Sequence, residues 1–231
     1  MTVAVTSTYT PTITPVATAT SQSTSLPVEF VWKLARDPNP FNAPVGVAID
    51  PQGDIYVMDT KNSRVQKYDQ DGKFLLMWGN PGSGDGQFSI SLPDEGRLAI
   101  DSRGDVYVID VSNFRIQKFD SQGSYLTQWG SRGDGDSQFI EPADIAIDQL
   151  DNIYVVDYQS YHVQKFDPNG KLLLRWGSAA QFTNTGSVAI DPQGNILVCD
   201  QSGRIRKFDS DGKLLSTIPV PATSHVHRVL Q

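Results

Sequence analysis

The chain has 231 residues, a formal net charge of −7 and a single cysteine. Its acidic balance argues against a nucleic-acid binder, because such proteins need a basic surface to displace phosphate counterions. One cysteine excludes a disulfide scaffold and a cysteine-based zinc cluster. No apolar run approaches the roughly 18 residues of a membrane span. We therefore expect no nucleic-acid partner and no membrane span.

Residues 1–26 differ in composition from the rest of the chain. They contain nine threonines, four serines, two prolines and no charged residue. Such a segment buries too little apolar surface to offset its chain entropy, so we expect a disordered linker. It lacks the basic start and apolar core of a signal peptide. It is either an inert tail or a spacer, and the spacer reading predicts an extracellular or cell-surface protein.

Residues 27–231 are dominated by a repeat of about 47 residues. Four aligned segments end their first element in an aspartate, at positions 50, 101, 148 and 191. A four-residue insertion before Asp101 and a four-residue deletion before Phe182 fall in equivalent loops, as stacked units on a fixed frame tolerate. The repeats span about 41–79, 80–130, 131–177 and 178–220.

Each repeat predicts four short strands. Alternating β-branched and aromatic residues, such as Ile55-Tyr56-Val57, are interrupted by turns such as Asp-Gln-Asp-Gly at 69–72. No stretch has a helical period. A four-stranded unit that recurs at this spacing predicts an all-β fold, a β-propeller of antiparallel blades.

Large rings recur at two repeat positions. We expect them to pack between neighbouring blades rather than to form a ligand-stacking ladder. The tryptophans are Trp32, Trp78, Trp129 and Trp176, and the phenylalanines are Phe41, Phe88, Phe139 and Phe182.

An aspartate and an arginine flank the turn between the second and third strands of three repeats. We expect a structural clasp in each, because catalysis needs one asymmetric site and these pairs recur. In the third repeat His162 replaces the arginine. The three pairs are Asp59 with Arg64, Asp110 with Arg115, and Asp200 with Arg204.

These motifs resemble the NHL repeat. The resemblance is carried by Arg-Ile-Gln-Lys-Phe-Asp at 115–120, by Gly-Asp-Gly-Gln-Phe at 84–88, and by the repeated Trp-Gly and Ala-Ile-Asp. It implies a propeller that has six blades in most of the family. That family contains protein-binding and RNA-binding modules, sensor domains and a few lyases, so the fold leaves the activity open.

The chain holds about four and a half predicted blades. Residues 27–34 match the last strand of a repeat, with Trp32 at the tryptophan position, and residues 225–230 resemble the start of another first strand. Either the chain is a fragment of a longer protein, or it forms an open arc. Open blade edges would favour self-association.

No catalytic constellation is recognisable, and we assign no catalytic and no metal-binding residue. His225 and His227 could share a strand face, but the sequence offers no third zinc ligand beside them. Asp134 and Asp136 lie in an acidic glycine-rich loop, which is more often solvated than a calcium site. Cys199 is predicted to be a buried packing residue.

Differences between the repeats gather in the loops of one face. The insertion carries Asp94 and Glu95, and the third repeat carries Tyr158, Tyr161 and His162. These five residues form a candidate recognition patch for a protein or small ligand. We therefore favour a non-catalytic binding or sensor module. The alternative is a propeller-type metal-dependent lyase or hydrolase whose site is incomplete in this chain.

Overall fold

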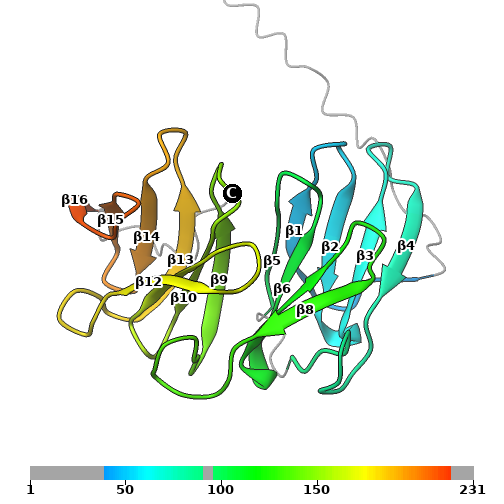
Figure 1. Ribbon diagram of the computed structural model, residues 1–231. Coiled ribbons are helices and arrows are strands. Elements are labelled where there is room, and N and C mark those ends of the chain that lie inside the picture. Colours follow the sequence, from blue (N-terminus) through cyan, green and yellow to red (C-terminus); the bar gives the residue numbers. More distant parts are fainter. Residues whose placement is uncertain (1–38, 91–95, 220–231) are drawn as a thin grey trace, which may run out of the picture. The chain divides into compact units, whose positions relative to one another are not determined.

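A computed structural model describes residues 39–90 and 96–219 (Figure 1). In these residues four antiparallel sheets of four strands each confirm the all-β propeller class. The helical elements described are two 3-10 turns, η1 (Thr60–Asn62) and η2 (Val111–Asn113). No helix in the described ranges has the length and apolarity needed to cross a membrane. The expected linker at 1–26 and the expected strands at 27–34 and 225–230 lie outside the described residues.

The strands of each sheet follow one another in the chain and pair with their sequence neighbours. The first sheet contains β1 (Pro44–Ile49), β2 (Ile55–Asp59), β3 (Arg64–Tyr68) and β4 (Phe74–Trp78). The second contains β5 (Leu98–Ile100), β6 (Val106–Asp110), β7 (Arg115–Phe119) and β8 (Tyr125–Trp129). The third contains β9 (Pro142–Ile147), β10 (Ile153–Asp157), β11 (Val163–Phe166) and β12 (Leu172–Trp176). The fourth contains β13 (Thr185–Ile190), β14 (Ile196–Asp200), β15 (Arg204–Phe208) and β16 (Leu214–Pro219).

Aspartate side chains close the turns between the strands. The Asp50 carboxylate accepts the N–H groups of Gln52 and Asp54, each at 2.9 Å, and Gly53 takes the left-handed backbone (φ 90°) that the turn requires. In the turn between β3 and β4 the Asp69 carboxylate likewise accepts the N–H groups of Asp71 and Lys73. Each turn thereby fixes the register of its hairpin.

The apolar core lies between the sheets rather than within one sheet. Tyr56 and Met58 of the first sheet pack against Val106 and Phe119 of the second, and all four are at most 1% exposed. Equivalent clusters join the second sheet to the third and the third to the fourth. The described tryptophans confirm the predicted packing between blades, because each ring lies against a phenylalanine ring of the next sheet. The distances between ring centroids are 5.8 Å for Trp78 and Phe119, 5.6 Å for Trp129 and Phe166, and 5.9 Å for Trp176 and Phe208.

A lysine adds a polar link at each of these interfaces, and it is buried at the first two and half-buried at the third. The Nζ atom of Lys67 donates to the carbonyl of Ser121 in the next sheet at 3.4 Å. Lys118 and Lys165 repeat the bond to Pro168 and Ser210, at 3.2 and 3.3 Å. The accepting turn also needs its glycine, since a Cβ on Gly123 would stand 2.7 Å from the Trp78 ring.

We expect Phe166→Ala to lower the free energy of unfolding by about 3–5 kcal/mol, because it opens a cavity between the second and third sheets. Leu126 on β8 is the control: it is 48% exposed, and its replacement by alanine should cost less than about 1 kcal/mol. Urea denaturation followed by tryptophan fluorescence measures both. Equal losses for the two variants would contradict an inter-sheet core.

Candidate functional site

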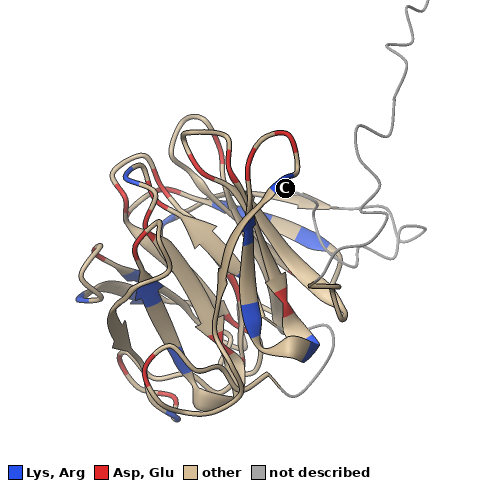
Figure 2. Ribbon diagram, turned by 90° about the vertical axis from the view of Figure 1, so that its right-hand side faces the viewer, with Lys and Arg blue, Asp and Glu red and all other residues tan. Residues whose placement is uncertain are grey.

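One face of the molecule collects the loops that differ between sheets. In each sheet the connection between the second and third strands is hydrogen-bonded to the crossover that enters that sheet. The bonds run from the N–H groups of Lys61, Ser112, Tyr158 and Gln201 to the carbonyls of Asn42, Ser89, Glu141 and Thr183. We call this the loop face. Figure 2 shows that acidic residues also colour the loops at both ends of the sheets.

Two of the predicted clasps form on the loop face. The Nε atom of Arg64 lies 2.7 Å from the Asp59 carboxylate, and the Nε atom of Arg115 lies 2.7 Å from that of Asp110. Each aspartate also accepts a backbone N–H from the crossover, that of Asn42 at 2.6 Å or Ser89 at 2.7 Å. These pairs tie the crossover to the hairpin and hold the frame.

The predicted pair Asp200 with Arg204 is wrong. The Asp200 carboxylate binds Arg206 instead, and Arg204 is exposed. The turn before Arg204 is one residue shorter than the turn before Arg64 or Arg115, so its side chain no longer faces the aspartate. Arg206 stands where the other sheets have a glutamine, such as Gln66 bonded to Asp59 at 3.0 Å.

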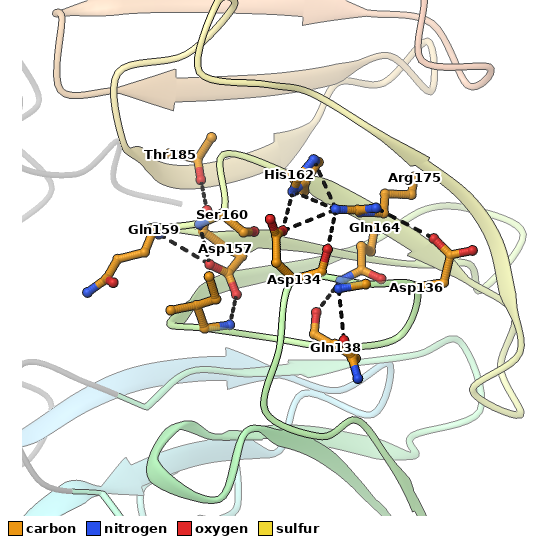
Figure 3. A network of polar contacts seen from close by, with 12 residues as sticks. Asp134, Asp136, Gln138, Asp157, Gln159, Ser160, His162, Gln164, Arg175 and Thr185 are labelled. Atoms are coloured by element: carbon orange, nitrogen blue, oxygen red, sulfur yellow. Dashed lines mark hydrogen bonds and ion pairs between the residues drawn. The ribbon is translucent and has the colours of Figure 1, made fainter.

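In the third sheet the buried aspartate at the end of the second strand is hydrogen-bonded without an arginine across the turn. The Asp157 carboxylate accepts four backbone N–H groups, from Ile140, Glu141, Gln159 and Ser160, at 2.7 to 3.2 Å (Figure 3). His162 does not pair with it. Because backbone donors already satisfy the Asp157 carboxylate, it needs no arginine partner. The side chain at the arginine position, His162, is therefore available for other contacts.

His162 instead joins a polar cluster with Asp134 and Arg175, shown in Figure 3. Its Nδ1 atom lies 3.1 Å from the Asp134 carboxylate, and Arg175 Nη2 lies 3.1 Å from both the ring nitrogens and that carboxylate. Arg175 Nη1 is 3.7 Å from Asp136. Burial and the positive charge of Arg175 lower the pKa of His162, and Asp134 and Asp157 offset this in part. The imidazole is therefore neutral at pH 7.

The candidate recognition patch is only partly within the described residues. Asp94 and Glu95 lie outside them. The Tyr158 hydroxyl accepts a hydrogen bond from Gln201 and so bridges the third and fourth sheets. Tyr161 is half-buried against the cluster between the same two sheets, which gives it a packing role. Tyr158 and the His162 cluster therefore remain as accessible elements of the patch.

The structure adds one charged pair that sequence reasoning missed. Arg97 and Asp144 occupy the same repeat position, just ahead of the repeated Ala-Ile-Asp, where the first and fourth repeats have Gly46 and Ser187. Arg97 Nε lies 4.0 Å from Asp144 Oδ1, and both side chains are 14% exposed. Asp144 also accepts the Val188 N–H at 3.0 Å, so the pair links three sheets. The sequence signal for this pair was that its position differs in every repeat, although the Ala-Ile-Asp that follows recurs.

Beyond this pair, the first strands of the four sheets, β1, β5, β9 and β13, line an apolar groove of about 580 Å³. We call these four the inner strands. Its walls are residues 47–49, 99–100, 145–147 and 189–190. The groove thus has a charged rim on the loop face and aliphatic walls, a combination typical of binding sites. Among the described residues no group of three His, Cys, Asp or Glu side chains is placed to hold a metal ion.

Comparison with known proteins agrees with the repeat pattern. Residues 41–68 match the model of the NHL repeat, and residues 96–175 match that of a 6-bladed beta-propeller. The chain therefore carries an NHL repeat within a propeller fold. It is 33% identical over 99 residues to human NHL repeat-containing protein 3, across 41% of this chain and 27% of the relative.

The other similarities include enzymes. Rat peptidylglycine alpha-amidating monooxygenase is 33% identical over 104 residues, which is 43% of this chain and 10% of the enzyme. A streptogramin B lyase structure superposes with a TM-score of 0.62 at 16% identity, over 81% of this NHL chain and 58% of the lyase. The matches thus span much less than the full length of the curated relatives, and the lyase structure shows the fold alone.

Replacing Arg206 should destabilise the protein far more than replacing Arg204. Arg206→Ala removes the arginine partner of the buried Asp200 carboxylate, which keeps hydrogen bonds from the N–H groups of Thr183 and Ser202 and from the Ser202 hydroxyl, so the loss should be about 1.5–3 kcal/mol. Arg204→Ala should change the stability by less than about 0.5 kcal/mol. Chemical denaturation of both variants measures the two losses. A larger loss for Arg204→Ala would support the pairing of Asp200 with Arg204 instead.

The stability should fall as the pH drops from 7 to 5. The pKa of His162 is lower in the folded protein than in the unfolded chain, so the unfolded chain takes up the proton first. The stabilisation is therefore present above the unfolded pKa near 6.5 and is lost below it. His162→Gln should flatten the pH dependence of the urea midpoint across this window. An unchanged slope would show that His162 does not cause it.

Proposed function

We propose that this NHL chain is a non-catalytic binding module whose ligand, a protein segment or a small molecule, occupies the loop face above the inner groove. One observation carries the proposal. The residues that repeat in every sheet serve packing and turns, whereas the side chains peculiar to one sheet, such as Arg97, Asp144 and Tyr158, gather on the loop face. A ligand with one apolar part and one polar or charged end would match the aliphatic walls and the charged rim.

The proposal includes a place for the remainder of the chain. Residues 1–26 would act as a spacer on an extracellular or cell-surface protein, which their Thr/Ser/Pro-rich composition supports. Accessibility of the intact protein to a protease added outside living cells would test the location.

Binding is tested with a peptide display library panned against the full chain. Enriched peptides should lose at least tenfold in affinity for the Arg97→Ala/Tyr158→Ala double variant. Their affinity should stay within twofold for Gln122→Ala, which lies in a turn at the opposite end of the sheets. Peptides that bind the double variant as well as the parent chain would place the binding surface elsewhere.

A lyase is the second candidate, because a structural neighbour with the same fold is a streptogramin B lyase. Incubating the full chain with a streptogramin B, with and without added divalent metal, and following the reaction by mass spectrometry separates the two functions. We expect no turnover above the protein-free rate. Turnover that requires the chain would overturn the binding-only proposal.

A further inference from the structure

The first sheet has a methionine where the second sheet has a hydrogen-bond acceptor. Met77 and Gln128 occupy the same repeat position, directly before the tryptophan that ends the fourth strand of each sheet. Each pairs across the ladder with a glutamine of the third strand, Gln66 or Gln117. Because the two side chains stand at equivalent places, their contacts can be compared one by one.

The arginines of the two clasps make matching contacts through two of their three nitrogens. The Nε atom of each lies 2.7 Å from its clasp aspartate. The Nη2 atom of Arg64 donates to the crossover carbonyl of Pro40 at 3.1 Å. That of Arg115 donates to the crossover carbonyls of Gly84 and Gln87, at 2.8 and 3.0 Å. The two guanidinium groups therefore lie in the same environment on these two sides.

The third nitrogen shows how the two sheets differ. The Nη1 atom of Arg115 donates to the amide oxygen of Gln128. The Nη1 atom of Arg64 lies 3.3 Å from the sulfur of Met77 instead. A thioether sulfur is a weak acceptor, whereas an oxygen that accepts from a guanidinium forms one of the stronger hydrogen bonds in proteins. The Arg64 clasp thus has a weak contact where the Arg115 clasp has a strong one.

Met77 is also accessible to solvent. It is 44% exposed, whereas Met58 is fully buried in the cluster between the first and second sheets. An exposed thioether can be reached by small oxidants. The methionine side chain is unbranched and turns about three bonds, so it can present a new oxygen atom to a neighbour without moving the backbone.

We propose that Met77 is an oxidation site whose sulfoxide oxygen accepts the hydrogen bond of Arg64, as the amide oxygen of Gln128 accepts that of Arg115. Hydrogen peroxide is the oxidant. A lone pair of the sulfur attacks one peroxide oxygen, an S–O bond forms as the O–O bond breaks, and the other oxygen leaves as water. The thioether is oxidised to the sulfoxide and the peroxide is reduced.

Oxidation at this position strengthens the fold, which is the reverse of its effect in a core. A sulfoxide in a core places a polar oxygen among apolar side chains, where it has no hydrogen-bond partner. Beside Arg64 the new oxygen meets a charged donor that is already in place. The first clasp then matches the second, and the crossover of the first sheet is held more firmly on the loop face.

Peptide mapping by mass spectrometry tests the site. The full chain is treated with a limiting amount of hydrogen peroxide, and the gain of one oxygen is followed at each methionine. Met77 should be oxidised at least tenfold faster than Met58, which is the internal control because it is buried. Equal rates at the two residues would overturn the proposal.

The thermal midpoint tests the new hydrogen bond. Oxidation should raise the Tm of the parent chain by about 2–4 °C, and untreated Met77→Gln should show the same rise. Met77→Leu is the control for oxidation at other residues, and peroxide should shift its Tm by less than about 1 °C. A Tm that falls or stays unchanged when Met77 is oxidised would contradict the proposal, as would an equal rise in Met77→Leu.

Removing the donor separates this hydrogen bond from a general effect of polarity. In Arg64→Ala the Asp59 carboxylate keeps the N–H group of Asn42 as a donor, so the crossover stays attached. Oxidation of Met77 should no longer raise the Tm of this variant. Arg204→Ala is the matched control and should keep the full rise, because Arg204 is exposed and belongs to the fourth sheet. A rise of equal size in Arg64→Ala would show that the sulfoxide does not bind Arg64.

Discussion

The structure depends on one repeated contact between neighbouring sheets. An indole ring and its apolar neighbours on one sheet pack against a phenylalanine of the next sheet along the chain. Strands of three to six residues cannot make a stable unit as a lone sheet, because a single sheet has no second layer on which to bury its apolar face. Stacking supplies that layer. Trp78, Trp129 and Trp176 each bridge two sheets in this way, and three lysines add a polar link at the same interfaces. Stability is then a sum of interface contributions rather than the property of one core.

Because the contacts between sheets stabilise the fold, the residues of the loop face can differ from sheet to sheet. The aspartate that ends each second strand is buried in all four sheets, yet its partners differ: an arginine across the turn, four backbone N–H groups, or an arginine from two positions further along. Each solution satisfies the same buried carboxylate. A side chain that does not bind this aspartate can form other contacts, as His162 does with Asp134 and Arg175. The loop face of the third sheet therefore differs from that of the other sheets.

The sequence predicted the frame well because its signals are local and periodic. The recurring Trp-Gly, the Asp-x-x-Gly turns and the alternating apolar residues each report on one strand or one hairpin, and the tryptophan packing followed from their fixed repeat position. The site was predicted less well because its contacts join different strands and sheets. Arg204 was paired with Asp200 by position in the alignment, but a turn one residue shorter redirects the side chain and Arg206 takes its place. The Arg175 partner of His162 comes from β12, and Arg97 meets Asp144 across two inner strands. Neither contact is visible until the strands are placed beside one another.

The most direct test of the account is hydrogen exchange measured strand by strand in the native NHL chain. If the stacked faces hold the sheets together, amides of β6, β7, β10 and β11, which belong to sheets with a described neighbour on both sides, should exchange most slowly. Those of β15 in the fourth sheet should open at a lower free energy, because a described sheet packs against only one of its two faces. Equal protection of all four sheets, or the slowest exchange in the fourth, would contradict the claim that contacts between sheets, rather than each sheet by itself, stabilise the fold.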